Sequence, residues 1–232
     1  MSKNHFFIFN PKSYLYGKEL EELARTADKV AKEVDFEIYV TAPYADLYRI
    51  KEATENITVC AQHLDGINPG RGMGAVLPDS LKEAGAGAVF LNHAEHPLTL
   101  AQLVQAVKRS KELGLTTIVC ANTVEEAKAV ATLGVDILLC EPTELIGTGQ
   151  VSDESYVRDT INEIKSIDPN VLIMQAAGIS NPLDVYNVIS LGADGTGCTS
   201  GIVKAGNPKE MLVDMVKAME LAIKGENYDS SL

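Results

Sequence analysis

The chain has 232 residues, of which 46% are hydrophobic, and a net charge of −12 at pH 7. This length and apolar content suit one large folded domain and exclude a disordered chain. No apolar run approaches the roughly 18 residues of a membrane span, and the apolar start of the chain is too short for a signal peptide. The negative charge argues against nucleic acid or anionic membranes as partners. We therefore expect a cytoplasmic protein.

One pattern repeats along the chain: a short apolar or β-branched segment, a loop, and an amphipathic helix. Helices are predicted over Lys18–Val34, Thr99–Leu113 and about Pro208–Ile223, because their apolar residues recur on one helical face. The predicted strands, in chain order, are Phe6–Phe9, Glu37–Thr41, Thr58–Ala61, Ala88–Leu91, Thr117–Cys120, Ile137–Cys140, Val171–Gln175 and Gly195–Cys198.

Strands that alternate with helices pair in parallel through right-handed crossovers. Eight such units in one chain of this length predict a closed (β/α)₈ barrel with outer helices, formed by residues 1–232 as a single domain. An open, doubly wound sheet is the alternative. The cysteines lie in or at the ends of predicted strands without a CxxC pair, which favours buried free thiols: Cys60, Cys120, Cys140 and Cys198.

In such a barrel the chemistry lies at the C-terminal ends of the strands. Lys12 follows the first predicted strand, His93 the fourth and Glu141 the sixth. Together they suit proton transfer beside a carbonyl: Glu141 as general base, His93 as hydrogen-bond donor to the carbonyl oxygen, and Lys12 as positive charge near a developing enediolate. This chemistry needs no metal and no organic cofactor. Each residue also has a structural alternative, such as an ion-pair member or a rim residue.

Turns rich in Gly, Ser and Thr follow the last two strands and include Ser180, Thr199 and Ser200. They suit a phosphate site built from backbone N–H groups, although the serines alone would be ordinary helix caps. The segment Pro142–Gly149 begins with a stiff proline and ends in Gly-Thr-Gly, which predicts a lid; an ordinary long loop is the alternative. We expect His63 at the rim or an interface, and His5 and His96 at the surface.

The chain resembles triosephosphate isomerases along nearly its whole length, and it is most similar to their shorter, archaeal-type branch. The segments that carry this resemblance are Asn10–Lys12, Ala61–Asp65, Gly70–Pro78, Leu91–Glu95, Glu141–Gly149, Ala177–Ser180 and Ser200–Ala205. Glu141-Pro-Thr-Glu-Leu-Ile-Gly-Thr-Gly149 is the most specific of them.

The resemblance implies a TIM barrel that interconverts glyceraldehyde 3-phosphate and dihydroxyacetone phosphate without a cofactor. It implies that Glu141 is the base, His93 the electrophile, and Lys12 and Asn10 substrate contacts, with Glu95 a partner of the lysine. Backbone N–H groups would hold the phosphate: those of Gly147, Ser180, Thr199 and Ser200. It also implies a homodimer or homotetramer whose contact uses the loop Asp65–Val76, with Met73 as an apolar anchor.

Four departures from the family pattern leave the substrate open, and one of them is His96, which stands where a basic residue usually follows Glu95. Pro11 stands where an aromatic residue is usual, and Ala94 stands where a serine usually follows the histidine. The last strand, Gly195-Thr-Gly-Cys198, has two glycines, which weaken its packing or make room for something. An isomerase of another short ketose phosphate, such as erythrulose phosphate, is therefore the second hypothesis. A barrel that binds a phosphorylated ligand without turnover is the third.

Overall fold

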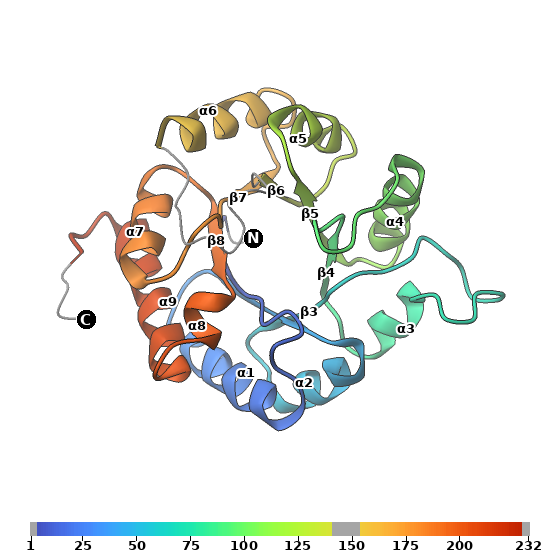
Figure 1. The fold of residues 1–232 in the computed structure, drawn as a ribbon, viewed down its shortest axis with the longest axis horizontal. Coiled ribbons are helices and arrows are strands. Elements are labelled where there is room, and N and C mark those ends of the chain that lie inside the picture. The colour runs from blue at the N-terminus through green and yellow to red at the C-terminus, as the bar shows by residue number, and fades with distance from the viewer. Residues whose placement is uncertain (1–3, 141–153, 229–232) are drawn as a thin grey trace.

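Eight parallel strands close into a barrel in the computed structural model, which describes residues 4–140 and 154–228 (Figure 1). The strands follow the barrel in sequence order, and β1 pairs with both β2 and β8. The open-sheet alternative is therefore wrong. The strand bounds are β1 Phe6–Phe9, β2 Glu37–Ala42, β3 Thr58–Ala61, β4 Ala88–Leu91, β5 Thr116–Ala121, β6 Ile137–Cys140, β7 Leu172–Met174 and β8 Gly195–Cys198.

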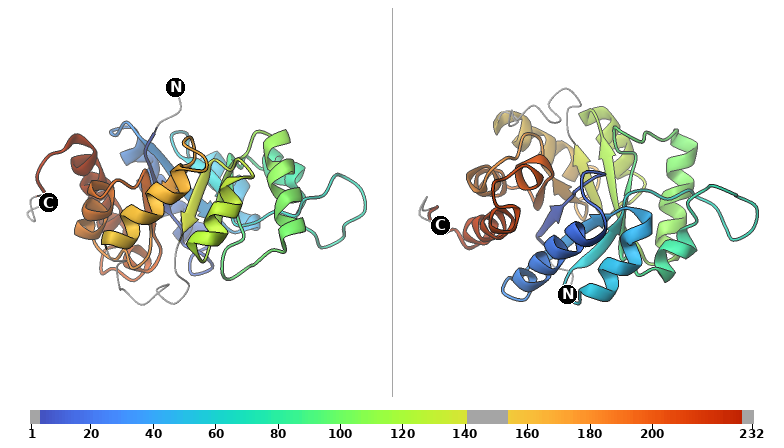
Figure 2. Two further views of the ribbon diagram at one scale, coloured as in Figure 1. Left: turned by 90° about the horizontal axis from the view of Figure 1, so that it is seen from above. Right: turned by 60° about the horizontal axis from the view of Figure 1, so that its bottom comes forward.

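Helices surround the barrel on its outside (Figures 1 and 2). They are α1 Gly17–Ala31, α2 Leu47–Ala53, α3 Pro78–Glu83, α4 Leu100–Glu112, α5 Val124–Ala131, α6 Glu154–Lys165, α7 Pro182–Ser190, the short α8 Ser200–Val203 and α9 Pro208–Lys224, with a 3₁₀ turn η1 at Tyr44–Asp46.

The observed ends of these elements differ from the predicted ones by a few residues. The largest difference is in α1, which was predicted to reach Val34 but ends at Ala31. There the N–H groups of Lys32 and Glu33 bond three residues back, to Lys29 and Val30, which tightens the last turn. Hydrophobic periodicity marks the buried face of a helix, but it carries no information about this change in hydrogen bonding.

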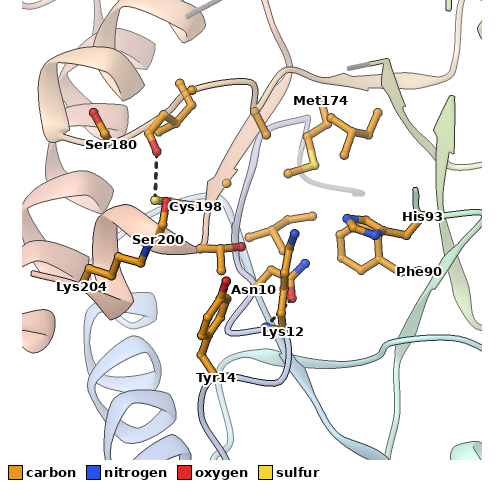
Figure 3. Close-up of a pocket in the computed structure, with 17 residues that line it drawn as sticks. Asn10, Lys12, Tyr14, Phe90, His93, Met174, Ser180, Cys198, Ser200 and Lys204 are labelled. Carbon is orange, nitrogen blue, oxygen red and sulfur yellow. Dashed lines mark hydrogen bonds between the residues drawn. The ribbon is translucent and has the colours of Figure 1, made fainter. Parts of the chain in front are cut away.

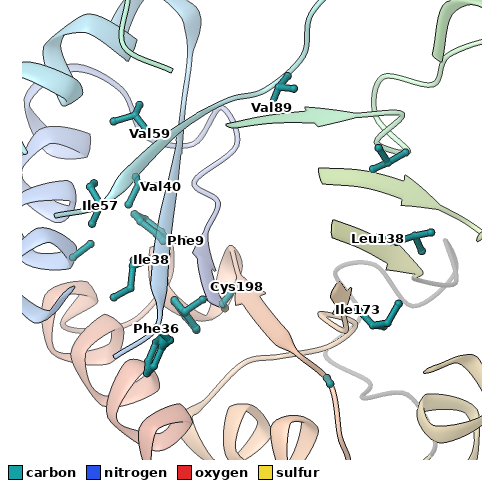
Figure 4. Packing of buried hydrophobic residues seen from close by; sticks show 14 of the residues in the cluster. Phe9, Phe36, Ile38, Val40, Ile57, Val59, Val89, Leu138, Ile173 and Cys198 are labelled. Atoms are coloured by element: carbon teal, nitrogen blue, oxygen red, sulfur yellow. The ribbon is translucent and has the colours of Figure 1, made fainter. Parts of the chain in front are cut away.

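Side chains of the strands form two separate apolar layers, because successive residues of a strand point to opposite faces. Outward-facing residues such as Phe9, Val40 and Leu138 pack under the helices (Figure 4). Inward-facing residues such as Phe6 and Met174 fill the barrel interior. All four cysteines are buried free thiols, as predicted.

The two glycines of β8 leave no empty space in the barrel. A Cβ atom on Gly195 would lie 2.4 Å from the ring of Phe6, and one on Gly197 would lie 2.7 Å from Cε of Met174. Neighbouring side chains therefore already occupy the space beside both glycines. Of the two expectations for these glycines, the structure supports the second: they make room, and the neighbours that use it are Phe6 beside Gly195 and Met174 beside Gly197.

Candidate active site

A cavity of about 210 Å³ opens at the C-terminal ends of the strands (Figure 3). Its floor is apolar and comes from the inward-facing residues Ile8, Phe90, Leu139 and Met174. Its rim is polar, and it brings together residues far apart in the sequence: Asn10, Lys12, Tyr14, His93, Ser180, Thr199, Ser200 and Lys204.

Lys12 is held at the rim by three hydrogen bonds. Its backbone N–H donates to Oδ1 of Asn10 at 3.0 Å, its carbonyl accepts from Nε2 of Gln62 at 2.7 Å, and its ammonium donates to Oε1 of Glu95 at 2.5 Å. Asn10 is itself fixed, because its Oδ1 also accepts from the hydroxyl of Thr41. The backbone of Lys12 has φ +49°, in the left-handed region that side chains other than glycine rarely adopt. Such strain persists where the surrounding contacts determine the conformation.

His93 follows a second strained residue, Asn92, whose φ is +57°. Among the described residues, Lys12 and Asn92 are the two non-glycine residues with positive φ. Asn92 is held from both sides, since its side chain donates to the carbonyl of Cys120 and accepts from the N–H of Leu98. This clamp directs the next residue, His93, into the cavity (Figure 3).

The protonation state of His93 follows from its contacts. Burial lowers the pKa of its imidazole below 6.5; the nearby Lys12 lowers it further, and Glu95 acts in the opposite direction. The backbone N–H of Glu95 donates to Nδ1 of His93 at 3.1 Å, so Nδ1 carries no proton. In the neutral ring the proton is then on Nε2. His93 can therefore donate a hydrogen bond into the cavity without carrying a charge.

The far end of the cavity is formed by the turns after β7 and β8. Thr199 precedes α8, and the N–H of Ser200, the first residue of this helix, has no intrahelical acceptor. Ser180 lies across the cavity, but both its N–H and its hydroxyl donate to Oδ2 of Asp184 at 2.9 Å. The Ser180 N–H would have to leave Asp184 to bind a phosphate.

Two predicted site residues lie outside the described residues: Glu141 and Gly147. The predicted lid, Pro142–Gly149, lies there as well. The structure does describe the two residues that precede Glu141. Cys140 is the last residue of β6, and Leu139 lines the cavity.

Two positioning residues were not recognised as such from the sequence. Gln62 and Asn92 stand at predicted strand ends, but no role was assigned to them. Asn at a position that needs positive φ is a usable signal, because Asn adopts this region more readily than most residues. The bond from Gln62 to the carbonyl of Lys12 spans 50 residues of sequence and has no local signal.

A second cavity of about 170 Å³ lies beside the first and shares Asn10, Lys12, Phe90 and His93 with it. His63 lines it and is almost completely buried, with Nε2 3.3 Å from Asp65 and no hydrogen-bond partner for Nδ1. Its ring lies 4.1 Å from that of His96, which is exposed as predicted. His5, in contrast, is half-buried, because its ring contacts the carbonyl of Asp194 at 3.1 Å.

In residues 4–140 and 154–228, no group of three or more His, Cys, Asp or Glu side chains is arranged to hold a metal ion. Within the same residues, no helix is long and apolar enough to cross a membrane.

A neutral imidazole, a lysine and polar turns at the C-terminal rim define an α/β barrel suited to acid–base chemistry. The family model for triosephosphate isomerase matches residues 5–219. The chain therefore belongs to the triosephosphate isomerase family.

Several triosephosphate isomerases similar to this chain come from archaea, which fits the archaeal-type branch. The triosephosphate isomerase of Methanobacterium bryantii is 40% identical over 214 residues, covering 90% of this chain and 94% of that protein. That of Methanocaldococcus jannaschii is 38% identical over 215 residues, covering 90% and 98%. The crystal structure of the enzyme from Bartonella henselae has the same fold, with a TM-score of 0.75 at 19% identity, covering 93% of this chain and 98% of that one.

Proposed function

We propose that this chain interconverts glyceraldehyde 3-phosphate and dihydroxyacetone phosphate, with Glu141 as the base that moves the proton between C1 and C2. The observation that best supports this is the hydrogen bond from the backbone N–H of Glu95 to Nδ1 of His93, which sets the tautomer of the ring. A neutral imidazole with its proton on Nε2, held beside a lysine, is the arrangement that polarises a carbonyl and stabilises an enediolate. A neutral histidine in this role is an established feature of triosephosphate isomerase.

The roles divide as follows. Glu141 removes the carbon-bound proton and returns it to the neighbouring carbon. His93 donates from Nε2 to the substrate oxygen that becomes negative, and Lys12 supplies a fixed positive charge beside it. The bond between Lys12 and Glu95 keeps the ammonium in place while part of its charge faces the cavity. No cofactor enters this chemistry.

We propose that the phosphate binds at the end of the cavity formed by the turns after β7 and β8. We assign this binding to the backbone N–H groups of Ser180, Thr199 and Ser200, together with Gly147. Orphan N–H groups at a helix start bind anions well, and Ser200 offers one. Ser180 joins them once its N–H is released from Asp184.

Steady-state turnover of glyceraldehyde 3-phosphate by the purified protein tests the assignment. We expect kcat/KM above ~10⁴ M⁻¹s⁻¹, the lower end for ordinary enzymes. Glu141→Gln removes the base and should reduce kcat by at least about 100-fold, the low end for general-base catalysis, while phosphate still binds. Glu125→Gln, a change of the same charge on the exposed start of α5, is the matched control. Wild-type turnover by Glu141→Gln would show that Glu141 is not the base.

A four-carbon ketose phosphate is the alternative substrate, and the packing of β8 argues against it. Two departures motivated it, Gly197 and Ala94, and the space beside Gly197 is filled by Met174. The cavity floor therefore has no added depth there. Assaying erythrulose phosphate beside the triose decides between them: a higher kcat/KM for the four-carbon sugar would favour the alternative.

We further propose that the protein is a cytoplasmic homo-oligomer. The loop between β3 and α3 extends away from the barrel (Figure 1), and Met73, a residue of this loop, is fully exposed. The base of the loop is fixed, because Asp65 bonds Val76 through both backbone and side chain. A loop held in this way presents Met73 to a second copy at little entropic cost.

Light scattering on the purified protein tests this proposal. We expect a mass of two or four chains for the wild type and a shift toward the monomer for Met73→Glu. Leu183→Glu, which also places a charge at an exposed apolar residue, is the control and should leave the mass unchanged. A wild-type monomer would refute the proposal.

A further inference from the structure

Lys204 is a charged residue of the cavity rim for which the acid–base chemistry has no use. It follows α8 directly, and its backbone N–H bonds the carbonyl of Ser200 at 3.0 Å, so the helical turn continues through it. Residues four apart in such a turn lie above one another, and side chains tilt toward the helix start. Figure 3 shows the Lys204 side chain directed toward Ser200 at the edge of the cavity.

Among the described residues, no carboxylate forms an ion pair with Lys204. In the part of the chain that the structure describes, its ammonium has neither an ion pair nor a hydrogen bond. Other lysines differ: Lys12 is paired with Glu95 and Lys165 with Asp194. Lys12 and Lys204 are the two charged side chains, among the described residues, that line the cavity.

The electrostatics of the protein favour a cation at the phosphate end of the cavity. A chain with a net charge of −12 repels a phosphate dianion, and the carboxylate of Asp184 lies close to the phosphate end through Ser180. Backbone N–H groups orient an anion but carry no net charge. In the view of Figure 3 the ammonium of Lys12 lies between Ser200 and His93, and it is already bonded to Glu95.

We propose that Lys204 is a substrate-positioning residue whose ammonium binds the phosphate dianion at the α8 end of the cavity. This inference rests on the proposed isomerase function, and it assigns the phosphate end its own cation. Lys204 would touch the part of the substrate that does not react, so its loss should weaken phosphate binding and lower kcat/KM for the phosphorylated substrate.

Binding of inorganic phosphate, measured by calorimetry at low salt, tests the proposal without depending on turnover. Lys204→Met should weaken phosphate binding about 10-fold, which corresponds to ~1.4 kcal/mol and is typical of one charged hydrogen bond. Lys204→Arg should stay within about two-fold of wild type, because it keeps the charge. Lys108→Met, at an exposed lysine of α4 that lines neither cavity, is the control for net charge and should change nothing.

Kinetics separate this role from a structural one. With glyceraldehyde 3-phosphate, kcat/KM should fall about 10-fold in Lys204→Met. Turnover of glyceraldehyde, which lacks the phosphate, should be the same as in the wild type, and so should Tm. Unchanged phosphate affinity in Lys204→Met, or an equal loss with glyceraldehyde, would overturn the proposal. Absence of isomerase activity in the wild type would refute the proposed function, whereas the phosphate titration would still decide the role of Lys204.

Discussion

Gly195 tests whether the barrel interior is as full as the packing indicates. In the variant Gly195→Ala, the new Cβ would lie 2.4 Å from two ring atoms of Phe6 and 2.6 Å from a third. Carbon atoms in contact lie ~3.5–4.0 Å apart, so the ring must move by about 1 Å. Phe6 is 1% exposed and makes an edge contact with Tyr39 at a centroid distance of 6.1 Å. Its ring therefore has little freedom to move.

The expected loss of stability is the difference between two effects. Overpacking a full core costs roughly 1–3 kcal/mol. Replacing glycine by alanine restricts the unfolded chain and returns about 0.4–1 kcal/mol. We expect Gly195→Ala to lower the free energy of unfolding by roughly 1–2 kcal/mol, which lowers Tm by roughly 2–8 °C for a domain of this size.

Denaturant unfolding followed by circular dichroism measures this difference. Gly206→Ala is the matched control, because a Cβ there meets nothing within 4 Å. In the double variant Gly195→Ala with Phe6→Leu, the clash is relieved, so the two changes together should cost less than their sum. If Gly195→Ala proved as stable as Gly206→Ala, the space beside Gly195 would be open.

Two further predictions concern ionisable groups. Burial and the nearby charge of Lys12 hold the pKa of His93 below 6.5, so Lys12→Met should raise this pKa. NMR titration of His93 measures the change, and an unchanged or lower pKa in the variant would contradict the electrostatics. Burial alone would raise the pKa of Asp28, but hydrogen bonds led by those from Asn56 outweigh burial and hold this pKa below 3.8. The ionised Asp28 therefore stabilises the folded state at neutral pH, and this stabilisation is lost as the pH falls through the lowered pKa. Asp28→Asn should lower the free energy of unfolding by about 1.5–3 kcal/mol at pH 7 and by progressively less under acid conditions. Urea unfolding at several pH values measures this loss, and a loss independent of pH would rule out the carboxylate as its source.

The sequence by itself determined the barrel and the strand that carries each site residue. Eight apolar segments alternating with helical patterns leave few topologies, and five of the eight predicted strands, among them Phe6–Phe9 and Gly195–Cys198, have their observed bounds. Residues that end parallel strands must meet at one rim, so Lys12 and His93 were expected together. This part of the fold follows from local periodicity and general rules of strand connection.

The tertiary structure alone decided how those residues are held and how the cavity is filled. The bond from Gln62 to Lys12 and the ion pair between Lys12 and Glu95 join positions 50 and 83 residues apart. The glycines of β8 were read as added space, but side chains from β1 and β7 occupy that space. A local sequence pattern does not predict packing against a distant strand. It predicts which face of an element a side chain lies on, but not which side chain of another element it contacts.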